Sequence, residues 1–233
     1  MLKLLKICIQ FPGEGIVMSG NQDLLRLAEL LCARLCHDLS GPLGALIGIL
    51  DLAREEAPDS ETVSLAEETA TELAQRLKLL RAAWGRESDD LDKGRLQDFA
   101  AGLLSGRRVR FDLDGLAPER LFSPAAARVM LNLLLLAAES LPGGGMVALA
   151  DAPSDGVLMT ISGARAAWPA GFSRWLAEPD TAVDAMLADP RRLQAPLTAL
   201  LVHGYGYRLS MLMPASAVGQ SELSPPLLLS LRP

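Results

Sequence analysis

Aromatic side chains are scarce in this chain: Phe, Trp and Tyr make up 4% of 233 residues, and there are only two histidines and three cysteines. A core with so few rings must consist mainly of Leu, Ala and Val, a composition that favours helices because Ala and Leu lose little freedom there. The odd, low cysteine count argues against a disulfide framework and indicates a reducing compartment. We therefore expect a helix-rich, cytoplasmic protein.

Positive charge and long apolar runs are also lacking. The net charge is −6 and the basic residues are scattered, so no basic surface for nucleic acid is expected. The longest apolar run, 129–138, contains Asn132 and is too short to cross a membrane. We therefore expect no membrane partner. Cys32 and Cys36 lie four residues apart, but no further ligands accompany them, so we expect no metal site.

A regular apolar repeat marks two long helices. Steps of three and four residues, typical of a heptad seam, recur from Asn21 up to the region before Pro58. The same repeat continues from Val63 to Trp84 after a short connection, so the two helices must be antiparallel neighbours. The first seam comprises Leu24, Ala28, Leu31, Leu35, Asp38, Pro42, Ala45, Ile49 and Leu52, and the second comprises Val63, Ala66, Ala70, Leu73, Leu77, Leu80 and Trp84.

Two helices alone do not bury both apolar stripes, so a second copy is expected to complete a four-helix bundle in a homodimer. The monomeric alternative is that the hairpin folds back on the rest of the chain. The sequence predicts an N-terminal extension (1–20), a helical hairpin (21–87), a second domain (92–215) and a C-terminal tail (216–233). Residues 1–17 lack the small-residue cleavage site of a signal peptide.

One segment of the first helix breaks helix rules. In Cys36-His37-Asp38-Leu39-Ser40-Gly41-Pro42-Leu43, a histidine and a carboxylate precede a glycine and a proline. Pro42 costs about 3 kcal/mol in a helix interior and predicts a kink. His37 flanks the seam and should face solvent, where its imidazole is a competent nucleophile, and Asp38 can orient the ring or accept its proton. An ordinary surface histidine beside an aspartate is the alternative.

This segment resembles the H-box of dimeric histidine-kinase phosphoacceptor domains, which His37, Asp38, Pro42 and Leu43 match. Over residues 21–215 the chain is similar to the ChpT-type histidine phosphotransferases of bacterial phosphorelays. The resemblance implies a hairpin dimerisation domain followed by a degenerate histidine-kinase-ATPase-like α/β sandwich, which makes the expected fold class α+β. The predicted order of elements in the second domain, helices alternating with strands of an antiparallel or mixed sheet, fits this expectation.

The nucleotide-binding residues of that ATPase domain are not recognisable. Asn132 begins a segment like the N-box, but Leu136 stands where the resemblance places a magnesium-binding asparagine. Gly163-Ala164-Arg165 follows the strand where an adenine-reading aspartate is expected, and no glycine-rich phosphate loop precedes the last helix. We therefore expect no bound cofactor and no ATP-dependent catalysis.

The resemblance implies that His37 takes a phosphoryl group from the aspartate of a hybrid kinase's receiver domain and passes it to response regulators. The receiver would supply Mg²⁺, and Asp38 would assist His37. The second domain would contribute to partner docking, and five hairpin residues are candidates for receiver contacts or for phosphoryl charge neutralisation: Arg34, Leu39, Leu43, Leu46 and Ile47. Two alternatives remain: a diverged but active histidine kinase, with Glu139 as a conceivable metal ligand, and a non-catalytic dimeric scaffold that binds response regulators.

Overall fold

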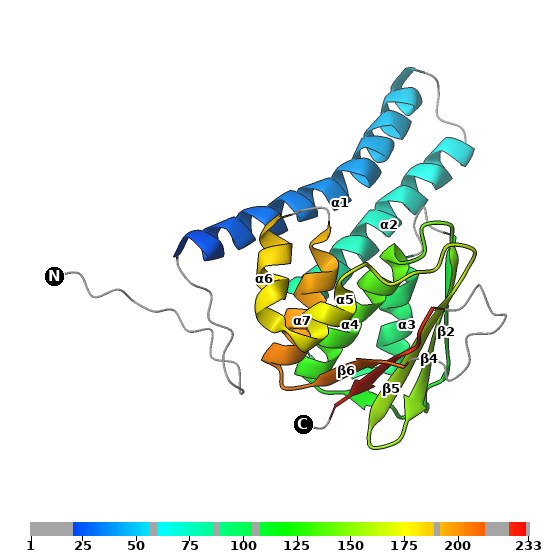
Figure 1. The fold of residues 1–233 in the computed structure, drawn as a ribbon. Helices are drawn as coiled ribbons and strands as arrows, with labels where there is room; N and C mark the ends of the chain where they lie inside the picture. The colour runs from blue at the N-terminus through cyan, green and yellow to red at the C-terminus, as the bar shows by residue number, and fades with distance from the viewer. Residues whose placement is uncertain are drawn as a thin grey trace.

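The protein combines two long helices with a five-stranded sheet that is covered by helices, so the expected α+β class is confirmed (Figure 1). The computed structural model describes residues 21–55, 60–85, 89–103, 108–188, 192–212 and 224–231. The predicted extension at 1–20 lies outside these residues.

The helical hairpin consists of α1 (Asn21–Glu55) and α2 (Ser60–Trp84). Their shared face holds half-buried apolar side chains of α1, among them Leu31, Leu35 and Ile49, as the seam predicted. Pro42 lies inside α1, and Figure 1 shows the helix bending between its darker and lighter blue halves. A proline removes one backbone hydrogen bond and clashes with the preceding turn, which accounts for a bend in a continuous helix.

The predicted seam is only partly the face between the helices. Ala28, Ala45 and Leu52 of α1 are exposed, although the three-four repeat places them on it. Outside that seam, Leu43 and Leu50 are about half exposed. The repeat fails to separate these faces because α1 carries two apolar stripes, one towards α2 and one that the described part of the chain leaves uncovered.

The sheet has the strand order β2-β4-β5-β7-β6. Only β2 and β4 run parallel, and the other neighbours are antiparallel. A separate pair joins β1 to β3. The strands are β1 (Leu91–Asp92), β2 (Val109–Gly115), β3 (Leu121–Phe122), β4 (Gly145–Ala152), β5 (Gly156–Ser162), β6 (Arg208–Met211) and β7 (Leu227–Ser230).

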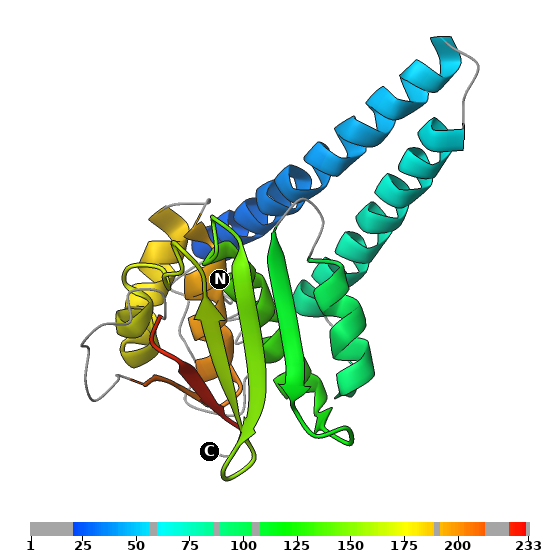
Figure 2. The ribbon, with the colours of Figure 1, turned by 90° about the vertical axis from the view of Figure 1, so that its right-hand side faces the viewer.

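The helices of the second domain cover one face of this sheet (Figure 2). They are α3 (Lys93–Ala101), α4 (Pro124–Glu139), α5 (Phe172–Ala177), α6 (Pro179–Ala188) and α7 (Gln194–Gly204). The central helix α4 begins with Ser123, whose hydroxyl accepts from the backbone N–H of Ala126, and with Pro124, which fits the first helical turn. Most of its residues are fully buried, so it forms the centre of the core.

The prediction that residues 216–233 form a tail outside the second domain is wrong for the last part of this segment. Residues 227–230 form β7, which pairs with both β5 and β6, and Leu227 and Leu229 are buried. The indole N–H of Trp168 donates to the carbonyl of Pro225, 2.7 Å away, which fixes the approach to the strand. A four-residue strand that follows two prolines carries no local signal, because its partners are distant in sequence.

The C-terminal half of α2 joins the hairpin to the second domain. Leu79, Leu80 and Ala83 are fully buried in the shared core. The guanidinium of Arg128 donates to the carbonyls of Ala83 and Trp84 at 3.3 and 3.2 Å, and thereby satisfies carbonyls that a helix end otherwise leaves without partners. The hairpin is thus packed against the domain as well as linked to it.

Candidate functional site

His37 lies on the outer face of α1, and 86% of its side chain is exposed. Its Nδ1 atom is 3.4 Å from Oδ1 of Asp38, the next residue. An exposed imidazole on a helix, with one nitrogen held by a carboxylate, is accessible to a second molecule and can react with it. The prediction that His37 faces solvent is therefore confirmed, whereas its chemical role remains a prediction.

Asp38 points inward and is held by two arginines. Its Oδ2 atom accepts from Nε of Arg34 at 3.1 Å and from the guanidinium of Arg76 at 3.2 Å, and only 8% of the side chain is exposed. Burial by itself would raise the pKa of Asp38. The charges of Arg34 and Arg76, with the hydrogen bonds from Arg34 and His37, outweigh burial and hold this pKa below its ordinary value.

Arg34 is placed differently from its predicted role in partner binding. Its guanidinium bridges Asp38 and Glu139, a residue at the end of α4, and 13% of its side chain is exposed. Burial would lower the pKa of Arg34, but the charges of Glu139 and Asp38 raise it above its ordinary value. Because it already has two carboxylate partners, Arg34 is poorly placed to neutralise a phosphoryl group on the surface. Glu139, the conceivable metal ligand of the kinase alternative, is paired with Arg34 in this structure.

This network assigns the protons of the imidazole. An ionised Asp38 only accepts hydrogen bonds, so the Nδ1 atom of His37 must be the donor towards it. The neutral ring then carries its lone pair on Nε2, which is the atom turned away from Asp38. A histidine whose tautomer is fixed by a carboxylate is the usual arrangement for nucleophilic or general-base chemistry.

The four apolar residues predicted to contact a receiver fall on different faces. Leu43 and Ile47 are about half exposed, whereas Leu39 and Leu46 are partly buried, with Leu39 packed against the core. Leu43 and Ile47 share a helix face because they are four residues apart. That face differs from the face of His37, which lies six and ten residues earlier on a helix of 3.6 residues per turn.

A row of glycines lies on the same face as His37; the sequence marked Gly41 as a break in helix rules, but not the row to which it belongs. Gly41, Gly44 and Gly48 follow His37 at intervals of four, three and four residues. A Cβ atom built on any of the three would meet nothing within 4 Å among the described residues. The protein's own packing therefore does not require glycine here. The spacing from His37 was the signal that would have found this surface.

Asn132, at the N-box-like position, is saturated with protein contacts. Its Oδ1 accepts from the indole of Trp84 and the amide of Gln194 at 3.2 and 2.9 Å. Its Nδ2 donates to the carbonyls of Ala83 and Arg128, both at 2.9 Å. The side chain is fully buried, and its two lone pairs and two protons are all used, so it fastens α2 to α4 and α7.

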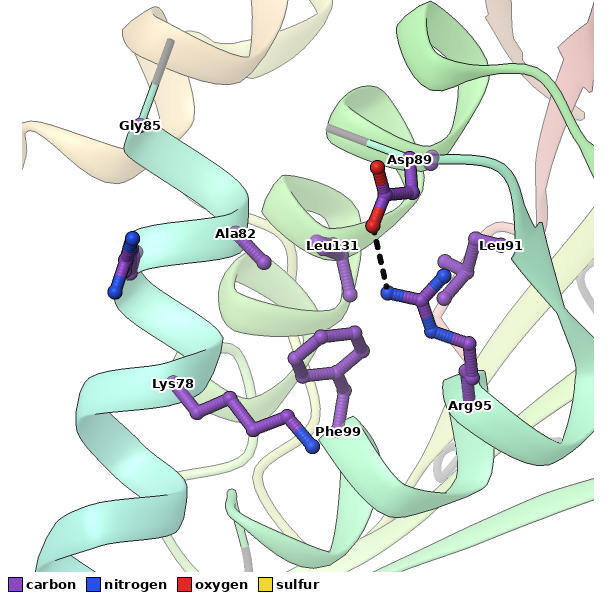
Figure 3. A pocket seen from close by; sticks show the side chains of 10 residues that line it. Lys78, Ala82, Gly85, Asp89, Leu91, Arg95, Phe99 and Leu131 are labelled. Atoms are coloured by element: carbon purple, nitrogen blue, oxygen red, sulfur yellow. Dashed lines mark hydrogen bonds and ion pairs between the residues drawn. The ribbon is translucent and has the colours of Figure 1, made fainter. Parts of the chain in front are cut away.

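One hollow of about 510 Å³ lies between α2, α3 and α4. Figure 3 shows Lys78 reaching over the ring of Phe99, and Arg95 paired with Asp89 across the hollow. The ammonium of Lys78 is 5.7 Å from the ring centroid, and the Arg95 guanidinium is 3.4 Å from the carboxylate of Asp89. These two cations thus have partners of their own, and neither His37 nor Asp38 lines the hollow.

Within the described ranges, no group of three or more His, Cys, Asp and Glu side chains is arranged to hold a metal ion. By length and composition alone, one described helical segment, Leu25–Arg54 of α1, would be apolar enough to cross a membrane, contrary to the expectation from the sequence. Arg34 and Asp38 lie within it and pair with α2 and α4, and one of its faces packs on α2. Length and composition therefore do not establish a span.

The fold places an exposed histidine, held by a carboxylate, on a helical hairpin that packs against a helix-covered sheet. A family model described as "Histidine phosphotransferase C-terminal domain" matches residues 93–216, more than half of the chain, and the chain belongs to this family. It is 28% identical over 196 residues to the "Protein phosphotransferase ChpT" of Brucella abortus (strain 2308), covering 80% of this chain and 90% of that protein.

A solved structure of a "Bacterial Phosphotransferase" has the same fold. It superposes with a TM-score of 0.66 at 24% identity and covers 94% of this chain and 100% of its own. The chain is thus a ChpT-type histidine phosphotransferase with a role in phosphorelay transfer, as the resemblance implied.

Proposed function

We propose that His37 is the residue that carries the phosphoryl group. The observation that supports this proposal is its exposed ring, with Nδ1 towards Asp38 and Nε2 towards solvent. His203, the other histidine, is partly buried at the end of α7, and its Nε2–H donates to the carbonyl of Leu176 at 2.7 Å. The Nε2 atom of His37 is open to a second protein's active site, whereas Nε2 of His203 is already bonded to a carbonyl.

In the forward step, Nε2 of neutral His37 attacks the phosphorus of a receiver's phospho-aspartate. The N–P bond forms while the bond from phosphorus to the aspartate oxygen breaks, and the aspartate leaves as a carboxylate. The ring keeps its Nδ1 proton and becomes positively charged, and the adjacent Asp38 carboxylate stabilises that charge. Transfer to the next receiver is the reverse reaction at another aspartate, so no external base is consumed.

ATP independence is part of the proposal. Asn132 uses its whole hydrogen-bonding capacity on protein groups, and Leu136 is fully buried where a magnesium-binding side chain is expected. The receiver would supply Mg²⁺ for transfer, so this chain needs no metal of its own.

Receiver domains of a hybrid kinase and of response regulators are the proposed partners, docking on the face formed by His37, Gly41, Gly44 and Gly48. Small residues let the backbone of a partner approach closely, because no side chain of α1 stands between them. Such an approach is required if a receiver aspartate is to come within bonding distance of Nε2. The exchange of phosphoryl groups with intracellular receivers also supports a cytoplasmic location.

A homodimer with a four-helix bundle is proposed from the exposed apolar stripes. On α1 the stripe is Leu43, Ile47 and Leu50, each about half exposed. On α2 the matching heptad is Val63, Ala70 and Leu77. Helical spacing places both stripes on the same side of the hairpin, next to the α1–α2 contact. The stripes suit a second copy, so Leu43 and Ile47 serve the dimer in this proposal.

The central test mixes the protein with a receiver domain that carries labelled phosphate, and in parallel with labelled ATP and Mg²⁺. We expect label to reach the protein from the receiver only. The His37→Ala variant should take up none, while His203→Ala, the matched control, should be labelled like the unaltered chain. Label taken from ATP would contradict ATP independence, and label retained by His37→Ala would contradict the assignment of the carrier.

A further inference from the structure

We infer that Glu139, at the end of α4 in the second domain, is a positioning residue for phosphoryl transfer and acts on His37 through Arg34 and Asp38. The inference rests on the proposed role of His37. In this inference the second domain does more than dock partners, because it also helps to orient the imidazole of His37.

The contacts form a continuous path from α4 to the imidazole. Glu139 accepts a hydrogen bond from one terminal nitrogen of Arg34. The Nε atom of the same guanidinium donates to Oδ2 of Asp38 at 3.1 Å, and Oδ1 of Asp38 faces Nδ1 of His37 at 3.4 Å. A guanidinium is planar and rigid, so fixing one edge of it fixes the direction of the other.

The two oxygens of Asp38 are divided between different partners. Arg34 and Arg76 both bind Oδ2, which leaves Oδ1 to face the imidazole. Without Glu139, the guanidinium of Arg34 has no second anchor and can turn to take both oxygens of Asp38, as arginines often do with carboxylates. Oδ1 would then be shared between Arg34 and His37, and the imidazole would lose its preference for the Nδ1–H tautomer.

Glu139 supplies one of the two negative charges that face Arg34 and Arg76 in the described pairs. Arg34 and Arg76 are positive, Asp38 and Glu139 are negative, and all four side chains are at most 22% exposed. Removing the Glu139 charge takes away one of these two negative charges and leaves Arg34 with Asp38 as its carboxylate partner in the described pairs. Two arginines would then compete for one carboxylate, which weakens its hydrogen bond to His37 and its stabilisation of the positively charged phosphohistidine ring.

The experiment compares Glu139→Gln, Arg34→Gln and the double variant with the unaltered full-length chain. The rate of transfer from a phosphorylated receiver is measured at saturating receiver, and receiver affinity is measured separately. We expect Glu139→Gln to slow transfer by about tenfold, an effect typical of a misplaced catalytic group. The affinity for the receiver should be unchanged. The double variant should be no slower than Arg34→Gln alone, because both changes break the same path.

A spectroscopic readout separates positioning from a purely structural effect. The ¹⁵N chemical shifts of the His37 ring report which nitrogen carries the proton, and His37→Ala identifies its signals among those of the two histidines. The spectra are recorded at a pH about two units above the ordinary pKa of histidine. We expect Nδ1–H in the unaltered chain and a mixture of tautomers in Glu139→Gln. Glu139→Asp should restore the signature in part.

Glu178→Gln is the matched control, because Glu178 pairs with Arg174 in an exposed i,i+4 salt bridge of the same domain. Wild-type rates and tautomer in Glu139→Gln would overturn the inference while leaving the role of His37 intact. A loss of receiver affinity with an unchanged tautomer would also overturn it, since that points to docking. Transfer that survives His37→Ala would instead contradict the proposed function itself.

Discussion

Arg76 of α2 donates to Oδ2 of Asp38 on α1 across 3.2 Å, and thereby joins the two hairpin helices at the level of the exposed histidine. Both side chains are largely buried, with 14% and 8% exposed. The same carboxylate that orients His37 therefore also fastens α1 to α2.

Arg76→Ala should lower the free energy of unfolding by about 2–4 kcal/mol, because it leaves Asp38 buried with one cationic partner fewer. Urea denaturation at fixed protein concentration measures this change. Arg54→Ala is the matched control, since Arg54 lies 4.0 Å from Asp51 in an exposed pair and should contribute almost nothing. Equal effects of the two substitutions would contradict the structural role of Arg76.

Acidification should remove the contribution of Asp38 to stability. The folded-state pKa of this carboxyl is below its ordinary value, so its contribution is present above the ordinary value and is lost as pH falls through the folded pKa. Asp38→Asn should be less stable than the unaltered chain at pH 7, and the difference should shrink below about pH 4. Unfolding free energies at several pH values test this, with exposed Asp51→Asn as control. A difference that stays constant would contradict the prediction.

Gly44→Ala should stabilise the hairpin and impair docking. Alanine is favoured over glycine in a helix by about 1 kcal/mol, and a Cβ atom at this position meets open space. If a receiver approaches along the glycine face, however, the methyl group should raise the receiver concentration needed for half-maximal transfer. Thermal unfolding and transfer kinetics are both measured. Higher stability with unchanged kinetics would remove Gly44 from the docking surface.

Ile47→Glu and Leu77→Glu should each produce monomers, because a charge in the proposed bundle interior has no partner there. Analytical ultracentrifugation of the unaltered chain should show a dimer. Leu65→Glu is the control: Leu65 is as exposed as Leu77 but lies on another side of α2, so this variant should remain dimeric. A monomeric unaltered chain would contradict the four-helix bundle.

What the sequence predicted well depends on short-range patterns. The hairpin follows from three-four spacing within each helix. The β4–β5 turn follows from the local Asp155-Gly156 signal, and the structure has Ser154 and Asp155 at positive φ there. Each of these features is decided by residues within a few positions of one another.

What the sequence missed depends on distant partners. Arg34 and Glu139 are 105 positions apart, so nothing near Arg34 shows that its charge is already paired. The strand β7 is likewise recognisable only once β5 and β6 are beside it. The glycine face of α1 is different. The spacing of these glycines from His37 is visible in the sequence, but only the structure shows that this face of the helix is open.

The position of β7 has a consequence for synthesis on the ribosome. Residues 227–230 lie between β5 and β6 and supply the pairing that joins these strands. The hairpin and the β2–β4–β5 part of the sheet can therefore form while the chain is still growing, but among the described strands β6 pairs only with β7 and must wait until residues 227–230 emerge. A nascent chain that stops short of residue 227 leaves an open edge on β5, which invites pairing with another molecule.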